Sequence, residues 1–182
     1  MPGDKYRIYI AGYVRDGIST HYELEPEYGY AMYHWGIWVE PKNGKGKGRS
    51  FHVAEHEPMN SDSGPIPGGW KFELHMEDVS ANPRLVGRLM IGKLPSGGGY
   101  SEIEGFLSKL PLPTESTDEN CISWVKTAVQ AFQKLDPLPW AEDFDVDEFM
   151  AYAFECFKKW HRKDCWQFSD KKVNYADSRR FP

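Results

Sequence analysis

The sequence predicts an α+β fold, in which an antiparallel sheet of about five strands packs against a central helix that begins at Cys121. From Ile122 to Leu135, apolar residues recur at spacings of three and four, which gives a helix one face for a core. Five earlier segments alternate apolar and polar residues, as half-buried strands do. Glycine- and proline-containing turn segments separate most of them.

Length and composition indicate a single domain over residues 1–182. The chain is 40% apolar and 15% aromatic, which is typical of a packed core rather than a disordered chain. We expect residues 1–166 to form the globular core and the polar residues 167–182 to form a loosely held tail.

Charge and cysteine content narrow the possible partners and the compartment. The net charge of -5 argues against a general nucleic-acid binder. No leader-like segment opens the chain and no run of about 18 apolar residues occurs, so we expect neither secretion nor a membrane anchor. Three cysteines, an odd number, are expected to be reduced, which favours a cytoplasmic location.

The predicted strands cover residues 5–14, 33–40, 50–54, 70–76 and 84–92. In the second strand, alternation places His34, Gly36 and Trp38 on one face. The third strand would pair antiparallel with the second and present His52 beside His34. Residues 16–30 and 58–69, rich in turn residues, are expected to be loops.

The segment between the second and third strands, residues 41–49, is rich in glycine and lysine. It lacks the Lys-Ser/Thr pair of a phosphate-binding P-loop, and no helix pattern follows it. We therefore interpret it as a mobile hairpin loop.

Three helices are predicted: residues 101–110, the central helix over residues 121–135, and a last helix whose first turn is crowded with acidic residues of the segment 143–150. Asp118 and Asn120 are typical residues just before a helix start. Cys121 would then lie in the first turn, where unpaired backbone N–H groups and the helix dipole favour thiolate over thiol. This position makes Cys121 a candidate nucleophile.

The order of these elements resembles the circularly permuted papain-like thiol enzymes, which include lecithin:retinol acyltransferase-like and H-Ras-suppressor-like acyltransferases. The matching segments are Tyr33-His34-Trp35-Gly36-Ile37-Trp38-Val39, Phe51-His52-Val53 and Asn120-Cys121. The chain also resembles a group of small fungal proteins with a His-Trp strand and a Cys-x-x-Trp-Val helix. It departs from the lipid enzymes in having Ile122-Ser123-Trp124 where they have Glu-His-Phe, and in a longer gap between the two histidines.

The resemblance and the residue types together imply a cysteine-dependent hydrolase or acyltransferase without a cofactor. His34 would act as the base and His52 would orient it. An ion pair of thiolate and imidazolium would attack an ester, thioester or amide of a small-molecule or carrier-bound acyl substrate and form an acyl-enzyme. The Cys121 N–H would stabilise the oxyanion.

The predicted substrate-binding residues surround this trio. Gly36 would leave room for the substrate, and Trp35 and Trp38 would wall the cleft. Asn120 and Trp124, on either side of Cys121, complete the set.

Other interpretations stay open at this stage. Cys121 can be a small buried hydrophobe and His52 a structural residue, in which case the chain is a non-catalytic small-molecule or protein-binding module that retains a papain-like shell. A metal site is not predicted. The candidate ligands are Cys156, His161 and Cys165, and only His161 and Cys165 share a helical face. The oligomeric state is left open.

Overall fold

A six-stranded sheet forms the centre of the computed structural model, which describes residues 5–66, 68–114, 118–162 and 171–175. The strand order is β6-β3-β2-β1-β7-β8. The bounds are β1 (Tyr6–Val14), β2 (Tyr33–Pro41), β3 (Lys47–His56), β6 (Gly69–Asp78), β7 (Leu85–Lys93) and β8 (Lys172–Asn174). All neighbours pair antiparallel except β7 and β8, which are parallel. The predicted α+β class and the five predicted strands are confirmed, with a sixth strand added.

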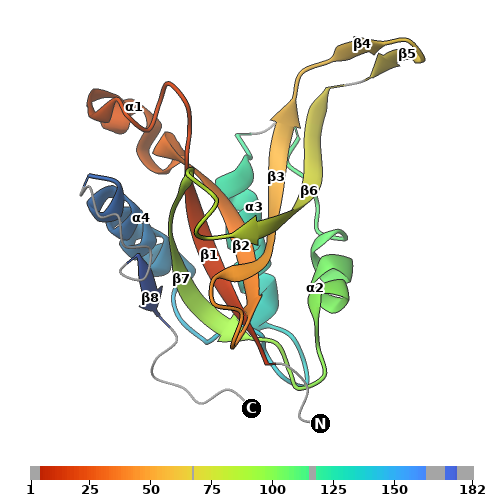
Figure 1. Ribbon diagram of the computed structural model, residues 1–182, viewed down its shortest axis with the longest axis vertical. Coiled ribbons are helices and arrows are strands. Elements are labelled where there is room, and N and C mark those ends of the chain that lie inside the picture. Colours follow the sequence, from red (N-terminus) through yellow and green to blue (C-terminus); the bar gives the residue numbers. More distant parts are fainter. Residues whose placement is uncertain (1–4, 67, 115–117, 163–170, 176–182) are drawn as a thin grey trace.

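Two helices, α3 (Cys121–Gln133) and α4 (Val146–Arg162), pack on one face of this sheet (Figure 1). The side chains of Trp35, Ile37 and Val39 point from β2 into the core that these helices cover. A Cβ atom at Gly12 would lie 2.6 Å from Cε2 of Phe157, so glycine allows α4 to approach β1. A third helix, α2 (Tyr100–Leu107), buries Ile103 and Leu107.

The face of the sheet opposite α3 and α4, here called the second face, carries a smaller apolar cluster. Its members come from β1, β2, β7 and the turn after β6: Tyr9, Ala11, Tyr13, Trp38, Val79, Leu85 and Met90. The carboxylate of Glu40 lies among them and accepts hydrogen bonds from the Trp38 indole (3.0 Å) and the Tyr9 hydroxyl (3.2 Å). It also forms a buried ion pair with Arg88, at 2.6 Å.

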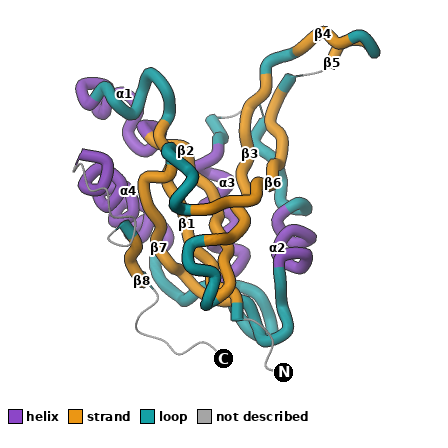
Figure 2. The backbone as a smooth tube through the Cα atoms, viewed as in Figure 1, coloured by secondary structure: helices purple, strands orange, loops and turns teal. Residues whose placement is uncertain are grey.

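Two segments predicted as loops contain short regular elements. Residues 16–32 hold α1 (Glu25–Tyr28) between two 3₁₀ turns, Tyr22–Leu24 and Gly29–Met32. Residues 59–66 form the hairpin of β4 (Met59–Ser61) and β5 (Gly64–Ile66), at the projecting end of the β3–β6 pair (Figure 2). Elements of three or four residues are too short to produce a periodic pattern, which is why the sequence indicated loops.

The C-terminal segment is also more ordered than predicted. Strand β8 pairs with β7 from Arg88 to Met90, and the Tyr175 N–H donates to the Met90 carbonyl at 3.0 Å. The prediction of a loosely held tail is therefore wrong for residues 171–175; residues 167–170 and 176–182 lie outside the described residues. Val173 and Tyr175 pack against the main core, a contact that only the tertiary fold provides.

Candidate functional site

Cys121 is the first residue of α3, as predicted, and Asn120 caps the helix. The Asn120 side-chain oxygen accepts hydrogen bonds from the N–H groups of Ile122 (2.9 Å) and Ser123 (3.4 Å). The Ser123 hydroxyl in turn accepts from the Asn120 N–H at 2.8 Å, which completes a capping box. The side chain of Asn120, predicted to bind substrate, is thus occupied by the cap.

The thiol of Cys121 is 9% exposed and belongs to the core beneath the helices. Burial raises its pKa above the usual value. Backbone N–H groups of Trp35, Cys121 and Ile122, with the charge of Arg15, act in the opposite direction but do not outweigh burial. The helix start alone therefore does not produce the thiolate that the sequence analysis expected, and the thiol form dominates at pH 7.

His34 and His52 are brought together on the second face, as their alternation predicted. His34 Nε2 lies 3.0 Å from His52 Nδ1, and His52 Nε2 lies 2.8 Å from the Ser50 hydroxyl oxygen. The Ser50 hydroxyl donates to the Glu77 carboxylate at 2.9 Å. Ser50 and Glu77 were not predicted; Ser50 was identifiable from the sequence, because it lies two residues before His52 and so shares its strand face.

This chain of hydrogen bonds determines which nitrogen of His34 carries a proton. Because the Ser50 hydroxyl hydrogen goes to Glu77, its oxygen must accept from His52 Nε2–H. His52 Nδ1 is then unprotonated and accepts from His34 Nε2–H. In neutral His34, Nδ1 therefore keeps its lone pair, and no hydrogen bond occupies it among the described residues.

Both imidazoles are held in the neutral form. Burial, reinforced by the charge of Arg15, lowers the pKa of His34 to about 4. Burial, reinforced by His34, lowers the pKa of His52 well below its usual value. The second face thus holds a neutral histidine pair at pH 7.

Cys121 and the histidines occupy the same end of β2 but different faces of the sheet. The thiol sulfur lies by the N–H of Trp35, the residue after His34. Strands β2 and β3 pair only from Ile37 to Val39 and therefore separate toward this end. Within the described ranges, no hydrogen bond joins Cys121 to either histidine. The structure thus brings together two of the three predicted catalytic side chains directly.

Both tryptophans of β2 are fully buried, which contradicts the prediction that they wall a cleft. Trp35 packs edge-on against Phe157, with ring centroids 4.8 Å apart, and donates to the Tyr30 carbonyl at 2.8 Å. Trp38 donates to Glu40 on the second face. Their size and donor groups serve the core, where a tryptophan N–H finds a partner.

Gly36 and Trp124 also have structural roles in place of the predicted substrate contacts. A Cβ atom at Gly36 would clash with His52 Nδ1, so the His52 ring occupies the space above this glycine. Trp124 is buried and packs against Phe72, with ring centroids 6.0 Å apart.

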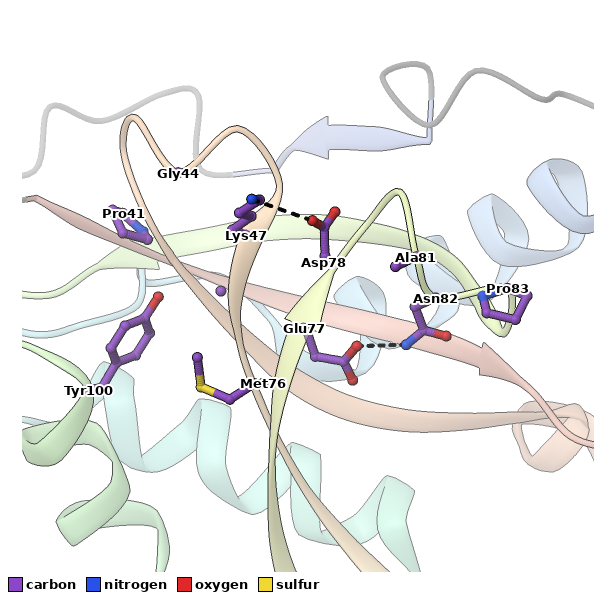
Figure 3. Close-up of a pocket in the computed structure, with 11 residues that line it drawn as sticks. Pro41, Gly44, Lys47, Met76, Glu77, Asp78, Ala81, Asn82, Pro83 and Tyr100 are labelled. Atoms are coloured by element: carbon purple, nitrogen blue, oxygen red, sulfur yellow. Dashed lines mark hydrogen bonds and ion pairs between the residues drawn. The ribbon is translucent and has the colours of Figure 1, made fainter.

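Two of the pockets on or beside the second face lie near the histidine pair or the turns next to it. One, of about 540 Å³, is lined in part by His34, His52 and His75, with Arg15 and Arg84. The larger, of about 720 Å³, lies between the turn before β3 and the turn after β6 (Figure 3). Lys47 forms an ion pair with Asp78 there, and Glu77 accepts a hydrogen bond from the Asn82 amide. The pocket includes none of the predicted catalytic residues.

The residues of the alternative metal interpretation do not converge. Cys156 is partly buried, and His161 Nδ1 lies 3.2 Å from the Tyr33 hydroxyl. Cys165 lies outside the described residues. Within the part of the chain that is described, no group of three His, Cys, Asp or Glu residues is placed to hold a metal ion.

A family model described as a family of unknown function, DUF6914, matches residues 5–179, so the chain belongs to this family. The match includes both histidines and Cys121. The chain matches no curated protein and no solved structure. In the described ranges, every helix is too short or too polar to cross a membrane.

The buried histidine pair predicts a pH-dependent stability. The pKa of His34 is about 4 in the folded chain, below the 6.5 usual in an unfolded one, so the unfolded chain binds the proton first. The contribution of neutral His34 to the free energy of unfolding is complete above pH 6.5 and is lost as the pH falls toward 4. At pH 5 the free energy of unfolding is lower by about 2 kcal/mol. Urea unfolding at several pH values should show a shallower dependence in His34→Gln, while the exposed-histidine variant His21→Gln keeps the parental one. Equal slopes in all three proteins would contradict this account.

Proposed function

We propose that the chain is a cysteine-dependent hydrolase or acyltransferase that acts on an ester, thioester or amide through an acyl-enzyme. Cys121 is the nucleophile, His34 Nδ1 the general base and His52 the residue that orients His34. The observation that carries this proposal is the hydrogen-bond chain from Glu77 through Ser50 and His52, which leaves the lone pair of His34 on Nδ1. A fixed tautomer of this kind is what a base requires.

The surroundings of Cys121 support the same assignment. The sulfur lies by the backbone N–H groups of Trp35 and of Cys121 itself. Two N–H groups near a nucleophile can stabilise the oxyanion that forms when a carbonyl is attacked. The Trp35 N–H is our candidate for the second donor. No local pattern indicates this donor, because its position depends on how β2 and β3 separate.

The pKa directions require that the reaction begin with a thiol and a neutral imidazole. As the sulfur forms a bond to the carbonyl carbon, the thiol proton would pass to His34 Nδ1 through a bridging water molecule, because the two side chains lie on different faces of the sheet. The bond to the leaving group then breaks, and the leaving group takes that proton. Water or another acceptor releases the acyl group from Cys121 in the reverse sequence. The proposed mechanism is therefore general-base catalysis and not attack by a preformed pair of thiolate and imidazolium.

The resemblance to circularly permuted papain-like enzymes fits this proposal in the order of its parts. A strand with His34, a neighbouring strand with His52 and a helix that opens on Cys121 follow one another along the chain. We propose on this basis that the fold is a permuted papain-like one. Substrates would be small or carrier-bound acyl compounds.

Acylation by p-nitrophenyl acetate tests the mechanism with a simple ester. We expect one acetyl group per chain, located at Cys121 by peptide mass spectrometry, with release of p-nitrophenol. His34→Ala should slow acylation by about 100-fold or more, the usual contribution of a general base. Because the pKa of His34 is about 4, the parental rate should be nearly constant from about pH 5.5 to 8. Cys156→Ala and His21→Ala serve as matched controls and should keep the parental rate.

The pH profile separates the proposal from ordinary thiol chemistry. If only free thiolate reacts, the rate should rise about tenfold per pH unit up to the raised pKa of Cys121, and His34→Ala should change little. That result would reject His34 as the base.

A non-catalytic binding module is the second candidate, favoured by the burial of Cys121 and by the lack of a hydrogen bond to either histidine in the described part. Its ligand would occupy the 540 Å³ pocket beside His34. Ligand binding that is unaffected by Cys121→Ala, together with no acylation, would favour this module.

A further inference from the structure

A group of charged side chains lines a pocket of about 570 Å³ at the end of β2 that is opposite to His34. We call it the basic pocket. Its lining comes from β1, β2, the turn after β2, the turn after β6, β7 and β8, and its charged members are Arg7, Glu40, Lys42, Lys45, Arg88 and Lys172. Five cations thus surround one carboxylate in a chain whose net charge is -5.

One of the five cations is already neutralised and held in place. Arg88 is buried and pairs with Glu40 at 2.6 Å. Its guanidinium also lies over the rings of Trp38, at 4.8 Å, and Tyr9, at 5.3 Å. Arg88 therefore forms a rigid polar wall of the pocket, and the charge of Glu40 is neutralised by Arg88.

The other four cations have no counter-charge among the described residues. In the part of the chain that the structure describes, none of Arg7, Lys42, Lys45 and Lys172 takes part in an ion pair. The Nε atom of Arg7 is buried and has no hydrogen-bond partner there. Like charges around one pocket repel each other, so a bound anion would lower the electrostatic energy and could satisfy the Arg7 donor.

The glycine- and lysine-rich turn supplies two of these cations. Lys45 and Gly46 adopt positive φ angles of 50° and 85°, so the turn is tight. Lys42 and Lys45 both line the basic pocket. The sequence excluded a P-loop, in which backbone N–H groups hold the phosphates; here side chains would do so.

We propose that the basic pocket binds a small molecule that carries a diphosphate or two phosphate groups. A carboxylate brings one negative charge against four uncompensated cations, whereas each phosphate ester brings about 1.5 to 2. Arginine and lysine are the residues that proteins use for phosphate. The site does not rest on the proposed acyl-transfer function, because Glu40 lies six residues along β2 from His34, about 20 Å in a strand.

Isothermal titration of the full chain with inorganic pyrophosphate at low salt tests the proposal. We expect a Kd below about 1 mM and a loss of about tenfold in each of Arg7→Gln and Lys172→Gln, the usual effect of removing one charged hydrogen bond. Lys71→Gln removes an exposed lysine on β6, outside the basic pocket, and should leave the Kd unchanged. Thermal melts confirm that each variant is folded.

A Kd weaker than about 1 mM, or an equal loss in Lys71→Gln, would overturn the proposal. Sedimentation with vesicles that contain phosphatidic acid separates the sources of phosphate. Pyrophosphate binding without vesicle binding supports a free phosphorylated compound. Binding of both, lost together in Arg7→Gln, supports the proposal with a lipid headgroup as its source. Vesicle binding without pyrophosphate binding would overturn it.

Discussion

Glu40→Gln is expected to lower the free energy of unfolding by about 3 to 5 kcal/mol, the usual cost of removing one partner of a buried ion pair. The Glu40 carboxylate accepts from Arg88, Trp38 and Tyr9, all of them buried on the second face. The glutamine amide carries no negative charge. Its NH₂ group would also face one of the three side chains that donate to Glu40. The Arg88 charge would stay buried without compensation, which is the main part of the cost. Urea unfolding at pH 7 measures the change.

Glu104→Gln is the matched control. Glu104 is half exposed and lies 3.9 Å from Arg49, so its loss should cost less than about 1 kcal/mol. Equal effects at the two positions would mean that burial of the Glu40 pair does not determine its contribution. The same measurement at high salt should weaken the Glu104 effect and leave the Glu40 effect nearly unchanged, because salt screens exposed charges more than buried ones.

Gly92→Ala is the second substitution with a large expected effect, a loss of about 3 kcal/mol or more. A Cβ atom there would lie 1.8 Å from the Trp140 carbonyl oxygen and 2.8 Å from the Ala141 Cα. These are backbone atoms, and the neighbouring hydrogen bonds hold them: Lys93 N–H to the Trp140 carbonyl at 3.0 Å and Glu142 N–H to the Ile91 carbonyl at 3.1 Å. The substitution must therefore separate residues 140–142 from β7. Thermal unfolding should show it directly.

Gly105→Ala makes the same chemical change where the structure has room. Gly105 lies in α2, and an added Cβ would meet no atom within 4 Å. Alanine is the better helix former, so this variant should be about 0.5 to 1 kcal/mol more stable than the parent. A similar loss in both variants would show that the close approach at Gly92 is not the cause.

Strand β2 connects the two proposed sites. His34 lies near its start and Glu40 near its end, and both side chains point to the second face. Between them, Trp38 belongs to the apolar cluster of that face. One strand thus positions the proposed base, His34, at one end and the ion-paired carboxylate of Glu40 at the other, with core packing between them.

Alternation and helical spacing were sufficient to predict the main elements of this fold. The strand over residues 33–40, the pairing of His34 with His52 on one face and the helix that begins at Cys121 all follow from local patterns. The cap before Cys121 is equally local, and the capping box confirms Asn120 in that role. Short elements such as β8 and α1 were not predicted, because three or four residues give no detectable period.

What the sequence determined by itself is which residue types lie on which face of each element, since the backbone period is a property of neighbours along the chain. Only the tertiary structure decided what those faces contact. It placed Cys121 across the sheet from the histidines, gave the space at Gly36 to His52, buried Trp35 and Trp38, and surrounded Glu40 with donors. Burial then shifted the pKa values of Cys121 and His34 toward neutral forms, because the cost of charging a group depends on the medium that the whole fold builds around it.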